Sequence, residues 1–428
     1  MEFLTPGERV KKIRKMLKLK QRELQSENIT RGFISMIESG RSTMSRETAS
    51  IIADKFNKRA QELGIDLNID GDYLLMTPAE EAEYYCVQKL KEIRTLEDLN
   101  ELKEIFEIAD KYKIKRVTAL SYVKIGDIMY GNLNYQDAFT NYYKALDILL
   151  LNNIKDQLPY IYNMLGACKV NMLEFSEAII YFDKAIEYAD ETNAIDIKNK
   201  TIYNNALCYR CIGQPTIAID YVDKYLSTWD KEKDFIHYIY ANSIKANCYR
   251  DMGNYEKALE LFKEMVKEVG NDEHPLLGFL YTNIGEIYME QSNFKESLEY
   301  FNKAEKIRRS KDENLLAHTL IEKANLYIKM ELYDEARSLL EEGLEISHRN
   351  SDIEYVVKGN YFLIEVYKQL GNRQAIIETY KRMVDVLQNT INKKEILKVY
   401  IELSLLYIED NDTINSRYYL QRAKEIIK

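Results

Sequence analysis

The chain has 428 residues, of which 46% are hydrophobic and 30% charged, and its net charge is −9. This composition is typical of a folded protein, and the low counts of 5 Pro and 16 Gly favour helices over turn-rich β architectures. No stretch approaches 18 consecutive apolar residues and the first residues have no apolar signal-peptide core, so we expect no membrane partner and a cytoplasmic location, where the five cysteines stay reduced.

The charge is unevenly distributed along the chain. Residues 1–64 contain 14 Lys and Arg against 8 Asp and Glu, whereas the remainder carries a net charge of −15. A basic segment in front of an acidic body indicates that only the first segment meets a polyanion such as DNA.

The first 64 residues are predicted to form a domain of about five helices. The TPGE string at 5–8 reads as a capping box that opens a helix, and apolar residues then recur at helical spacing. A second helix is expected near 20–26, a third near 30–39, and a further one after Ser45. The string LKQREL…ITRGFISMIESGR resembles the helix-turn-helix of phage-type repressors.

This resemblance implies how the head would contact DNA. The second helix would cross the phosphate backbone, and the third would enter the major groove. Ile34 and Ile37 face inward at helical spacing, which leaves the other face of the third helix for base edges. The expected DNA-binding residues are Gln21, Arg31, Gly32, Ser35, Met36, Arg41, Ser42 and Arg46. The alternative is that these residues are only solvated, and Arg14 and Glu38 are expected to form an internal salt bridge.

The segments that follow the head are predicted as a linker and a leading helical pair. Residues 65–77 are the expected linker. Thr77-Pro78-Ala79-Glu80 reads as a second capping box, and residues 78–113 are expected to form an atypical pair of helices in front of a repeat array.

From residue 114 onward the sequence repeats with a period of 39 or 40 residues. One recurring slot, mostly small, falls at Gly126, Gly166, Ala206, Ala246, Gly285, Ala324, Ile364 and Ser404. A second such slot falls twelve residues after each of these, and a Tyr or Phe often stands at plus sixteen, where we expect it to fill the gap between neighbouring hairpins. The pattern resembles the tetratricopeptide repeat, in which small residues let two antiparallel helices approach closely.

Eight such units over 114–428 predict an all-α fold, with the helix-turn-helix domain followed by a right-handed superhelix of tetratricopeptide-like hairpins. A phage-repressor head joined to such an array resembles the RRNPP-type peptide-sensing transcription regulators (PlcR/NprR/Rgg-like). The resemblance implies that a short signalling peptide binds in the concave groove. It also implies a homodimer on a near-palindromic double-stranded DNA operator, because a repressor head gains affinity from two half-sites.

Groove positions follow from the repeat register, in which the inner helices line the concave side. The expected peptide-binding residues are Tyr160, Asn163, Asn204, Arg210, Tyr240, Asn247, Arg250, Asn283 and Asn325. An Asn amide both donates and accepts, so it can pair with an extended peptide backbone, while Arg210 and Arg250 together can hold a carboxylate. The alternative is that the asparagines are ordinary surface residues and that the arginines pair with acids of the groove.

Nothing in the sequence predicts an enzyme, a metal site or a cofactor. Cys208 and Cys211 form a CxxC, but no further ligands accompany it, and Cys168, Cys208 and Cys248 share one repeat position, which indicates core packing. Walker, GxGxxG, GxSxG and HxxxH motifs are absent. The function predicted is a ligand-controlled transcription regulator, and the alternative is a protein-interaction module that sequesters a partner protein, with DNA binding secondary.

Overall fold

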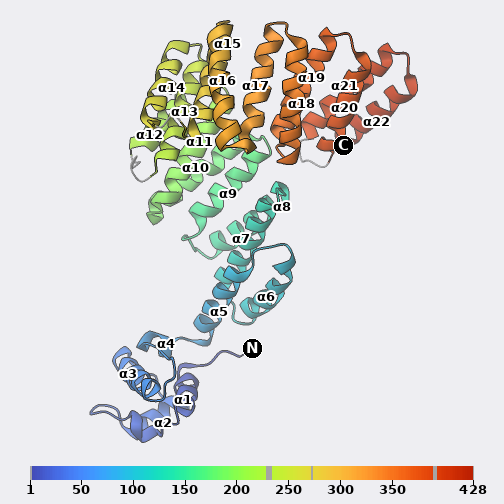
Figure 1. The fold of residues 1–428 in the computed structure, drawn as a ribbon. Helices are drawn as coiled ribbons and strands as arrows, with labels where there is room; N and C mark the ends of the chain where they lie inside the picture. Colours follow the sequence, from blue (N-terminus) through green and yellow to red (C-terminus); the bar gives the residue numbers. More distant parts are fainter. Residues whose placement is uncertain (1, 228–233, 271–272, 389–392, 428) are drawn as a thin grey trace. The chain divides into compact units, whose positions relative to one another are not determined.

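The computed structural model describes residues 2–227, 234–270, 273–388 and 393–427. Over these residues the chain is helical with no strand, and an isolated bridge between Ser26 and Ile29 is its β-type pairing. The all-α fold class, with a helix-turn-helix domain followed by tetratricopeptide-like hairpins, is confirmed (Figure 1).

The head contains five helical elements. They are α1 (Pro6–Met16), the 3₁₀ turn η1 (Gln21–Leu24), α2 (Arg31–Glu38), α3 (Arg46–Glu62) and α4 (Gly71–Leu75). Side chains of Thr5, Thr30, Ser45 and Asp70 accept backbone N–H groups of the first helical turns, so each α-helix begins at a capped position. The helix expected near 20–26 is the short 3₁₀ turn η1, which ends where Gln25 adopts an extended conformation.

The head packs its apolar residues into one core around α3. Leu17, Leu24, Ile34 and Phe56 are fully buried in it. Gly7 lets α1 approach the end of α2, because a Cβ at that position would lie 2.1 Å from the carbonyl oxygen of Ile37. No larger residue fits there without moving one of the two helices.

Residues 65–77, expected as a linker, are instead part of the head. Leu74 of α4 is fully buried in the head core. The Asn57 side chain donates to the carbonyl of Ile69 at 2.7 Å and accepts its N–H at 3.0 Å, which fixes the chain in front of α4. Seven of the 13 residues in this segment are Ile, Leu, Met or Tyr, and five of these pack in or against the head core.

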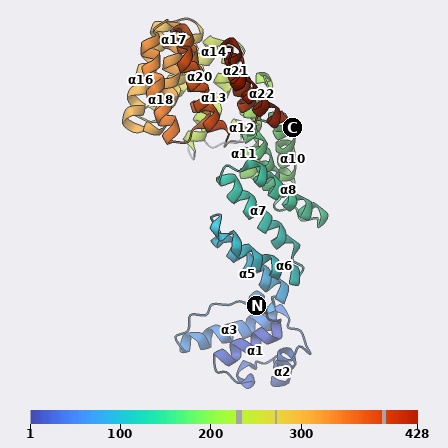
Figure 2. The ribbon, with the colours of Figure 1, turned by 90° about the vertical axis from the view of Figure 1, so that its right-hand side faces the viewer.

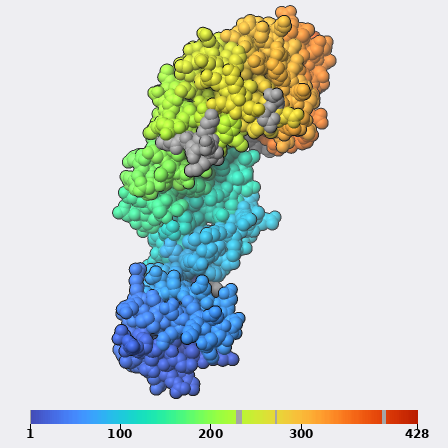
Figure 3. Space-filling model, turned by 60° about the vertical axis from the view of Figure 1, so that its left-hand side comes forward, coloured from blue at the N-terminus to red at the C-terminus, as the bar shows by residue number. Residues whose placement is uncertain are grey.

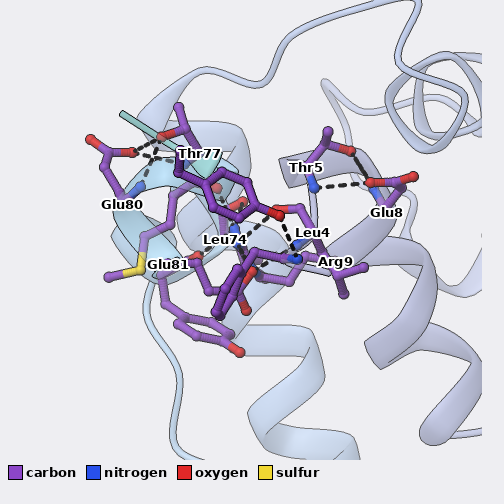
Figure 4. Close-up of polar contacts among 12 residues, drawn as sticks. Leu4, Thr5, Glu8, Arg9, Leu74, Thr77, Glu80 and Glu81 are labelled. Atoms are coloured by element: carbon purple, nitrogen blue, oxygen red, sulfur yellow. Dashed lines mark hydrogen bonds and ion pairs between the residues drawn. The ribbon is translucent and has the colours of Figure 1, made fainter. Parts of the chain in front are cut away.

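A buried arginine joins the head to the leading pair, α5 (Pro78–Glu92) and α6 (Leu102–Lys111), which are separated by the 3₁₀ turn η2 (Glu97–Glu101). Arg9 is 1% exposed, and its guanidinium donates to the carboxylate of Glu81 at 2.8 Å and to the carbonyl of Met76 at 2.6 Å (Figure 4). It also donates to the carbonyls of Leu4 and Tyr73. In the space-filling view the head and the following residues form a continuous surface (Figure 3).

The N-terminal arm extends this joint. The N–H of Leu4 donates to the Glu81 carboxylate at 2.8 Å, and Phe3 packs between the rings of Tyr85 and Tyr112 in the core of the leading pair. The head is thus held to the leading pair by buried contacts on both sides of α1.

After α6 the helices of the repeats follow one another. They are α7 (Lys115–Gly131), α8 (Tyr135–Leu151), α9 (Leu158–Asn171), α10 (Phe175–Thr192), α11 (Ile195–Cys211), α12 (Pro215–Ser227), α13 (Phe235–Asp251), α14 (Tyr255–Val269), α15 (Leu276–Glu290), α16 (Phe294–Lys311), α17 (Leu316–Lys329), α18 (Tyr333–Arg349), α19 (Ile353–Gln369), α20 (Arg373–Leu387), α21 (Lys393–Glu409) and α22 (Thr413–Ile427), with a 3₁₀ turn η3 (Glu313–Leu315) before α17. The chain divides into two compact units: unit 1 holds residues 1–171 and 180–198, and unit 2 holds residues 172–179 and 199–428.

In unit 2, consecutive helices from α12 to α22 pack against one another in chain order (Figures 1 and 2). Helix α17 also contacts both α15 and α19 directly, which places these first helices of their hairpins on the inner side of the stack.

The recurring small residues work within each hairpin. A Cβ on Gly126 would lie 2.7 Å from the Tyr142 ring, and one on Gly166 would lie 2.5 Å from the Phe182 ring. The aromatic residue at plus sixteen therefore fills the space inside its own hairpin rather than the gap between neighbours. Tyr142 and Phe182 are fully buried as a result.

Candidate DNA-binding face and ligand groove

The outward face of α2 carries the residues expected to meet base edges. Arg31, Gly32, Ser35 and Met36 are all exposed, while Ile34 and Ile37 are buried in the head. The Thr30 side chain caps the helix by accepting the N–H of Phe33, so Arg31 is the first residue of α2. The structure thus brings the four residues together on one solvent-facing side of a single helix.

Gly32 has open space where a side chain would be. A Cβ there would meet only the hydroxyl of Thr30, at 3.9 Å. Packing within the described protein therefore does not require a glycine here. Without a side chain, this position leaves space for a ligand such as DNA to approach the α2 backbone closely.

A basic depression of about 430 Å³ lies beside the start of α2. It is lined by Arg14, Lys20, Gln21, Arg22 and Arg31, which come from α1, from η1 with the residue before it, and from α2. Four of these five side chains are cationic, so the depression suits a phosphate group.

Glu38 fixes three elements of this face. Its carboxylate accepts two hydrogen bonds from Arg14, at 2.5 and 2.9 Å, which confirms the expected internal salt bridge. It also accepts the side-chain amide of Gln21 at 2.9 Å. Burial opposes ionisation of Glu38, but these hydrogen bonds hold its pKa below the ordinary value. Gln21 therefore has a structural partner in addition to any phosphate contact, because the end of α2 lies beside the start of η1.

Three further residues expected to bind DNA follow the C-terminal end of α2. Arg41 and Arg46 are exposed and Ser42 is half-buried in the turn that leads to α3. Arg46 approaches Asp72 at 3.4 Å, but both side chains are more than two-thirds exposed, so this pair holds the guanidinium only weakly.

In unit 1 the predicted groove residues are Tyr160 and Asn163, both half-buried on α9. The Tyr160 hydroxyl donates to Asp127 at 2.7 Å, and Tyr142 donates to the same carboxylate oxygen at 2.8 Å. Burial raises the pKa of Asp127, although the two hydroxyls partly offset this by stabilising the charged form. Tyr160 is thus engaged in a polar network of its own hairpins.

In unit 2 two predicted asparagines meet. The side-chain amide of Asn247 on α13 donates to the side-chain oxygen of Asn283 on α15 at 3.2 Å, and Asn283 in turn donates to the carbonyl of Phe279. Asn247 is 9% exposed, and its own side-chain oxygen accepts no hydrogen bond from any described residue. Asn204 and Asn325 are half-buried on α11 and α17, and Tyr240 packs edge-on against the Phe279 ring at 5.6 Å.

Arg210 and Arg250 are already paired with acids. Arg210 donates to Asp251 at 2.7 Å, and Arg250 donates to Glu286 at 2.6 Å with Glu290 at 3.8 Å. The stated alternative, that these arginines pair with acids, thus describes the structure, and their contact with a ligand carboxylate stays a prediction. Their partners stand on the neighbouring inner helix, 36 to 41 residues away in sequence, where composition alone does not reveal them.

Three groove-side charges were missed at the sequence level. Besides Glu286, they are Glu322 on α17, which is 3% exposed, and Lys358 on α19, which contacts the Glu322 carboxylate. Burial, with repulsion from Glu286, raises the pKa of Glu322 to about 7. For Glu322 the sequence signal was an acid two residues before the small-residue slot at Ala324.

Other site types have no support in the described residues. No group of three or more His, Cys, Asp and Glu side chains is placed to hold a metal ion, and no helix of the described chain combines the length and apolarity that a membrane crossing requires. Cys168, Cys208 and Cys248 are fully buried free thiols, as their shared repeat position predicts, and burial raises the pKa of each.

Family models agree with this architecture. A helix-turn-helix domain model matches residues 7–80, and tetratricopeptide repeat models match residues 238–310 and 316–350. The first match includes α4 and the start of α5, in keeping with the docking of residues 65–77 on the head.

Two curated relatives are similar to this chain over more than half of its length. The chain is 24% identical to the regulatory protein RapD of Bacillus subtilis over 287 residues, covering 64% of this chain and 78% of RapD. It is 22% identical to the transcriptional activator NprA of Geobacillus stearothermophilus over 258 residues, covering 58% of this chain and 63% of NprA. The apo form of the quorum sensor NprR from B. thuringiensis aligns with a TM-score of 0.48 at 19% identity, over 81% of this chain and 99% of that one.

The resemblance to RRNPP-type regulators is confirmed by these comparisons, since a helix-turn-helix model and tetratricopeptide models match in the expected order. The matching models describe a helix-turn-helix domain and tetratricopeptide repeats, and the two curated relatives are named as a regulatory protein and a transcriptional activator.

Proposed function

We propose that the protein is a sequence-specific transcription regulator whose DNA binding is controlled by a short signalling peptide in the groove of its repeats. The observation that carries this proposal is the outward face of α2, where Arg31, Gly32, Ser35 and Met36 stand together beside a basic depression. A helix with one buried face and one free polar face next to phosphate-binding cations is the arrangement with which repressor-type heads read a major groove.

Within this proposal each side of the head has a role. Arg31 makes a bidentate contact to a guanine, and Gly32 permits close approach of the DNA. Arg22 and Lys20, beside the α2 N-terminus, contact one phosphate, while Arg41, Ser42 and Arg46 contact the next. The Arg14–Glu38–Gln21 network fixes the angle between η1 and α2, so it supports recognition without touching a base.

The groove role rests on the inner helices of unit 2. Asn247 and Asn283 form a pair of amides across two neighbouring inner helices, and such amides match the N–H and C=O groups of an extended peptide. Asn204, Asn325 and Tyr240 lie on inner helices of the same unit, and Tyr160 and Asn163 provide the corresponding positions in unit 1.

A homodimer is proposed to form through the last hairpin. Leu420 is 48% exposed and Ile427 is 72% exposed, whereas the residues forty positions earlier, Tyr380 and Leu387, are buried. The exposed apolar residues of α22 are proposed as a contact surface for a second copy of the chain.

The test is DNA binding by the purified protein on duplex fragments from its own genome, followed by footprinting. We expect a near-palindromic protected site whose affinity falls steeply with salt, because several phosphates are neutralised. Arg31→Ala should weaken that site by about 10-fold or more, the loss expected for one bidentate base contact, while Arg59→Ala on α3 serves as a charge-matched control. Unchanged binding by Arg31→Ala would contradict the assignment of α2 as the reading helix.

The second candidate is a protein-interaction module. Similarity to response regulator aspartate phosphatase A of Bacillus subtilis, which is 23% identical over 68% of this chain, favours a role in binding a partner protein. Recovery of one stoichiometric protein partner, together with DNA binding that no peptide changes, would support this candidate instead.

A further inference from the structure

A cleft of about 280 Å³ lies between α18, α19 and α20, three consecutive helices of unit 2 (Figure 1). We propose that this cleft binds a small zwitterion with the size and charges of a free α-amino acid that has an apolar side chain. The cleft is separate from the peptide groove, so the inference does not depend on the proposed function.

The cleft lies on the side of α19 that faces away from the groove. Asn360, Leu363 and Tyr367 line it, and they recur at i, i+3 and i+7, which places them on one helical face. Lys358, which contacts the groove-side acid Glu322, stands two residues before Asn360 and therefore about 160° away around the helix. A peptide in the groove and a ligand in the cleft would thus contact opposite faces of α19.

The cleft is open because a short side chain occupies a position that larger residues fill in most hairpins. Asn360 stands four residues before the recurring slot at Ile364, and six of the eight hairpins have Tyr, Ile or Leu at the corresponding position. In the second hairpin this residue is Tyr162, which stacks on the Tyr188 ring at 5.4 Å. An asparagine is too short to fill the same space, so it leaves a cavity with a polar floor.

The floor of the cleft offers a fixed hydrogen-bond acceptor. Asn360 is 3% exposed, and its side-chain nitrogen donates to the carbonyl of Val356 at 2.7 Å. This bond holds the nitrogen against α19, so the side-chain oxygen points away from the backbone of its own helix, and no described residue donates to it. A buried acceptor is costly to leave unpaired, which indicates a ligand that brings an N–H donor.

The two walls of the cleft carry opposite charges that do not meet. Glu341 and Glu345 stand on α18, and Arg382 stands on α20. None of the three forms an ion pair with another described residue, whereas Arg309 of the preceding hairpin pairs with Glu342 at 2.7 Å. A ligand with one charge would face a like charge on one wall, but a zwitterion can place its ammonium toward α18 and its carboxylate toward α20.

The remaining lining residues specify the ligand further. Burial and the nearby Arg382 guanidinium lower the pKa of His348, so its imidazole is neutral at pH 7 and can donate an N–H to the same carboxylate as Arg382. Leu344 and Leu363 are 7% and 1% exposed and give the cleft an apolar part. The volume is just below the range of roughly 300–1,000 Å³ that is usual for ligand pockets, which favours an amino acid over a peptide.

Binding of free amino acids tests the proposal. The full-length protein is screened by thermal shift against each of the common free L-amino acids, and the affinity of the strongest binder is measured by calorimetry. We expect an apolar amino acid to bind best, and its N-acetyl and amide derivatives to bind about 10-fold more weakly or worse, because each lacks one of the two charges. The proposal would be overturned by a screen without any binder, or by a derivative that binds as tightly as its parent.

Three variants of the full-length protein locate the site. Arg382→Gln removes an exposed guanidinium that donates to the Thr379 hydroxyl, so it should weaken binding by about 10-fold or more and leave the fold intact. Asn360→Tyr introduces the side chain that four other hairpins have at this position, and it should abolish binding by filling the cleft. Arg337→Gln on α18, where Asp334 is the partner, is the charge-matched control and should bind like the wild type. Wild-type affinity in both cleft variants would show that the amino acid binds elsewhere, and the assignment of the cleft would be wrong.

Discussion

Replacing Arg9 with leucine tests how the head is joined to the leading pair. The guanidinium donates to four backbone carbonyls and to the carboxylate of Glu81 within a site where Arg9 is 1% exposed. Leucine fills part of the volume but donates no hydrogen bond, and Glu81 loses its only strong cationic partner in the joint. Removing one partner of a buried ion pair costs about 3–5 kcal/mol.

This loss should appear locally rather than as global unfolding. The joint consists of the N-terminal arm, α4 and the start of α5, so backbone amides at 3–9 and 71–81 should open more often in Arg9→Leu. A cost of about 3–4 kcal/mol corresponds to exchange faster by about 10²- to 10³-fold, because each 1.4 kcal/mol is tenfold. Hydrogen exchange followed by mass spectrometry measures this directly.

The control is Arg59→Leu, which removes an arginine whose partner is Glu62 on the head surface. It should leave exchange at 71–81 unchanged. If Arg9→Leu also left these amides protected, the guanidinium would not hold the joint and the reasoning would be refuted. With faster exchange, we also expect DNA binding by the head to persist while its response to peptide is lost, because a loose joint does not transmit a change in the repeats.

Three further results are expected. Gly32→Ala should leave the melting temperature of the head unchanged or slightly raised, because its Cβ meets no atom closer than 3.9 Å, yet weaken operator binding; a footprint of wild-type strength would show that DNA does not approach this position. The pKa of Glu322 is raised to about 7, so the folded protein keeps a proton on this carboxyl that the unfolded chain releases near the ordinary pKa of Glu. The free energy of unfolding should therefore fall as the pH rises from the ordinary pKa of Glu to about 7. Urea titrations should show this fall in the wild type and in Glu299→Gln but not in Glu322→Gln. Leu133 has a φ of 61°, at the turn position that Gly253 occupies in a later repeat. Leu133→Gly should therefore stabilise the protein by about 0.5 kcal/mol, and Gly253→Leu should destabilise it by about 1 kcal/mol. The opposite signs in thermal unfolding would show that the left-handed backbone at these positions is not strained for a leucine.

Much of the fold could be read from local spacing. The repeat of small residues places each hairpin, because a Cβ on Gly126 would lie 2.7 Å from the Tyr142 ring and one on Gly285 would lie 3.2 Å from the Phe301 ring. The face of α2 could likewise be assigned, since burial of Ile34 and Ile37 at helical spacing leaves Arg31 and Ser35 outside. Both inferences depend only on neighbours within one helix or one hairpin.

The tertiary structure decided which polar groups are already satisfied. The sequence left open whether Arg210 and Arg250 pair with acids, and the structure places Asp251 and Glu286 on the next inner helix as their partners. A side chain's charge is a property of its residue type, whereas its partner is set by the stacking of hairpins, which brings together residues about 40 positions apart. Docking of residues 65–77 through Arg9 was hidden for the same reason: the carbonyls that receive its guanidinium carry no signature in the sequence.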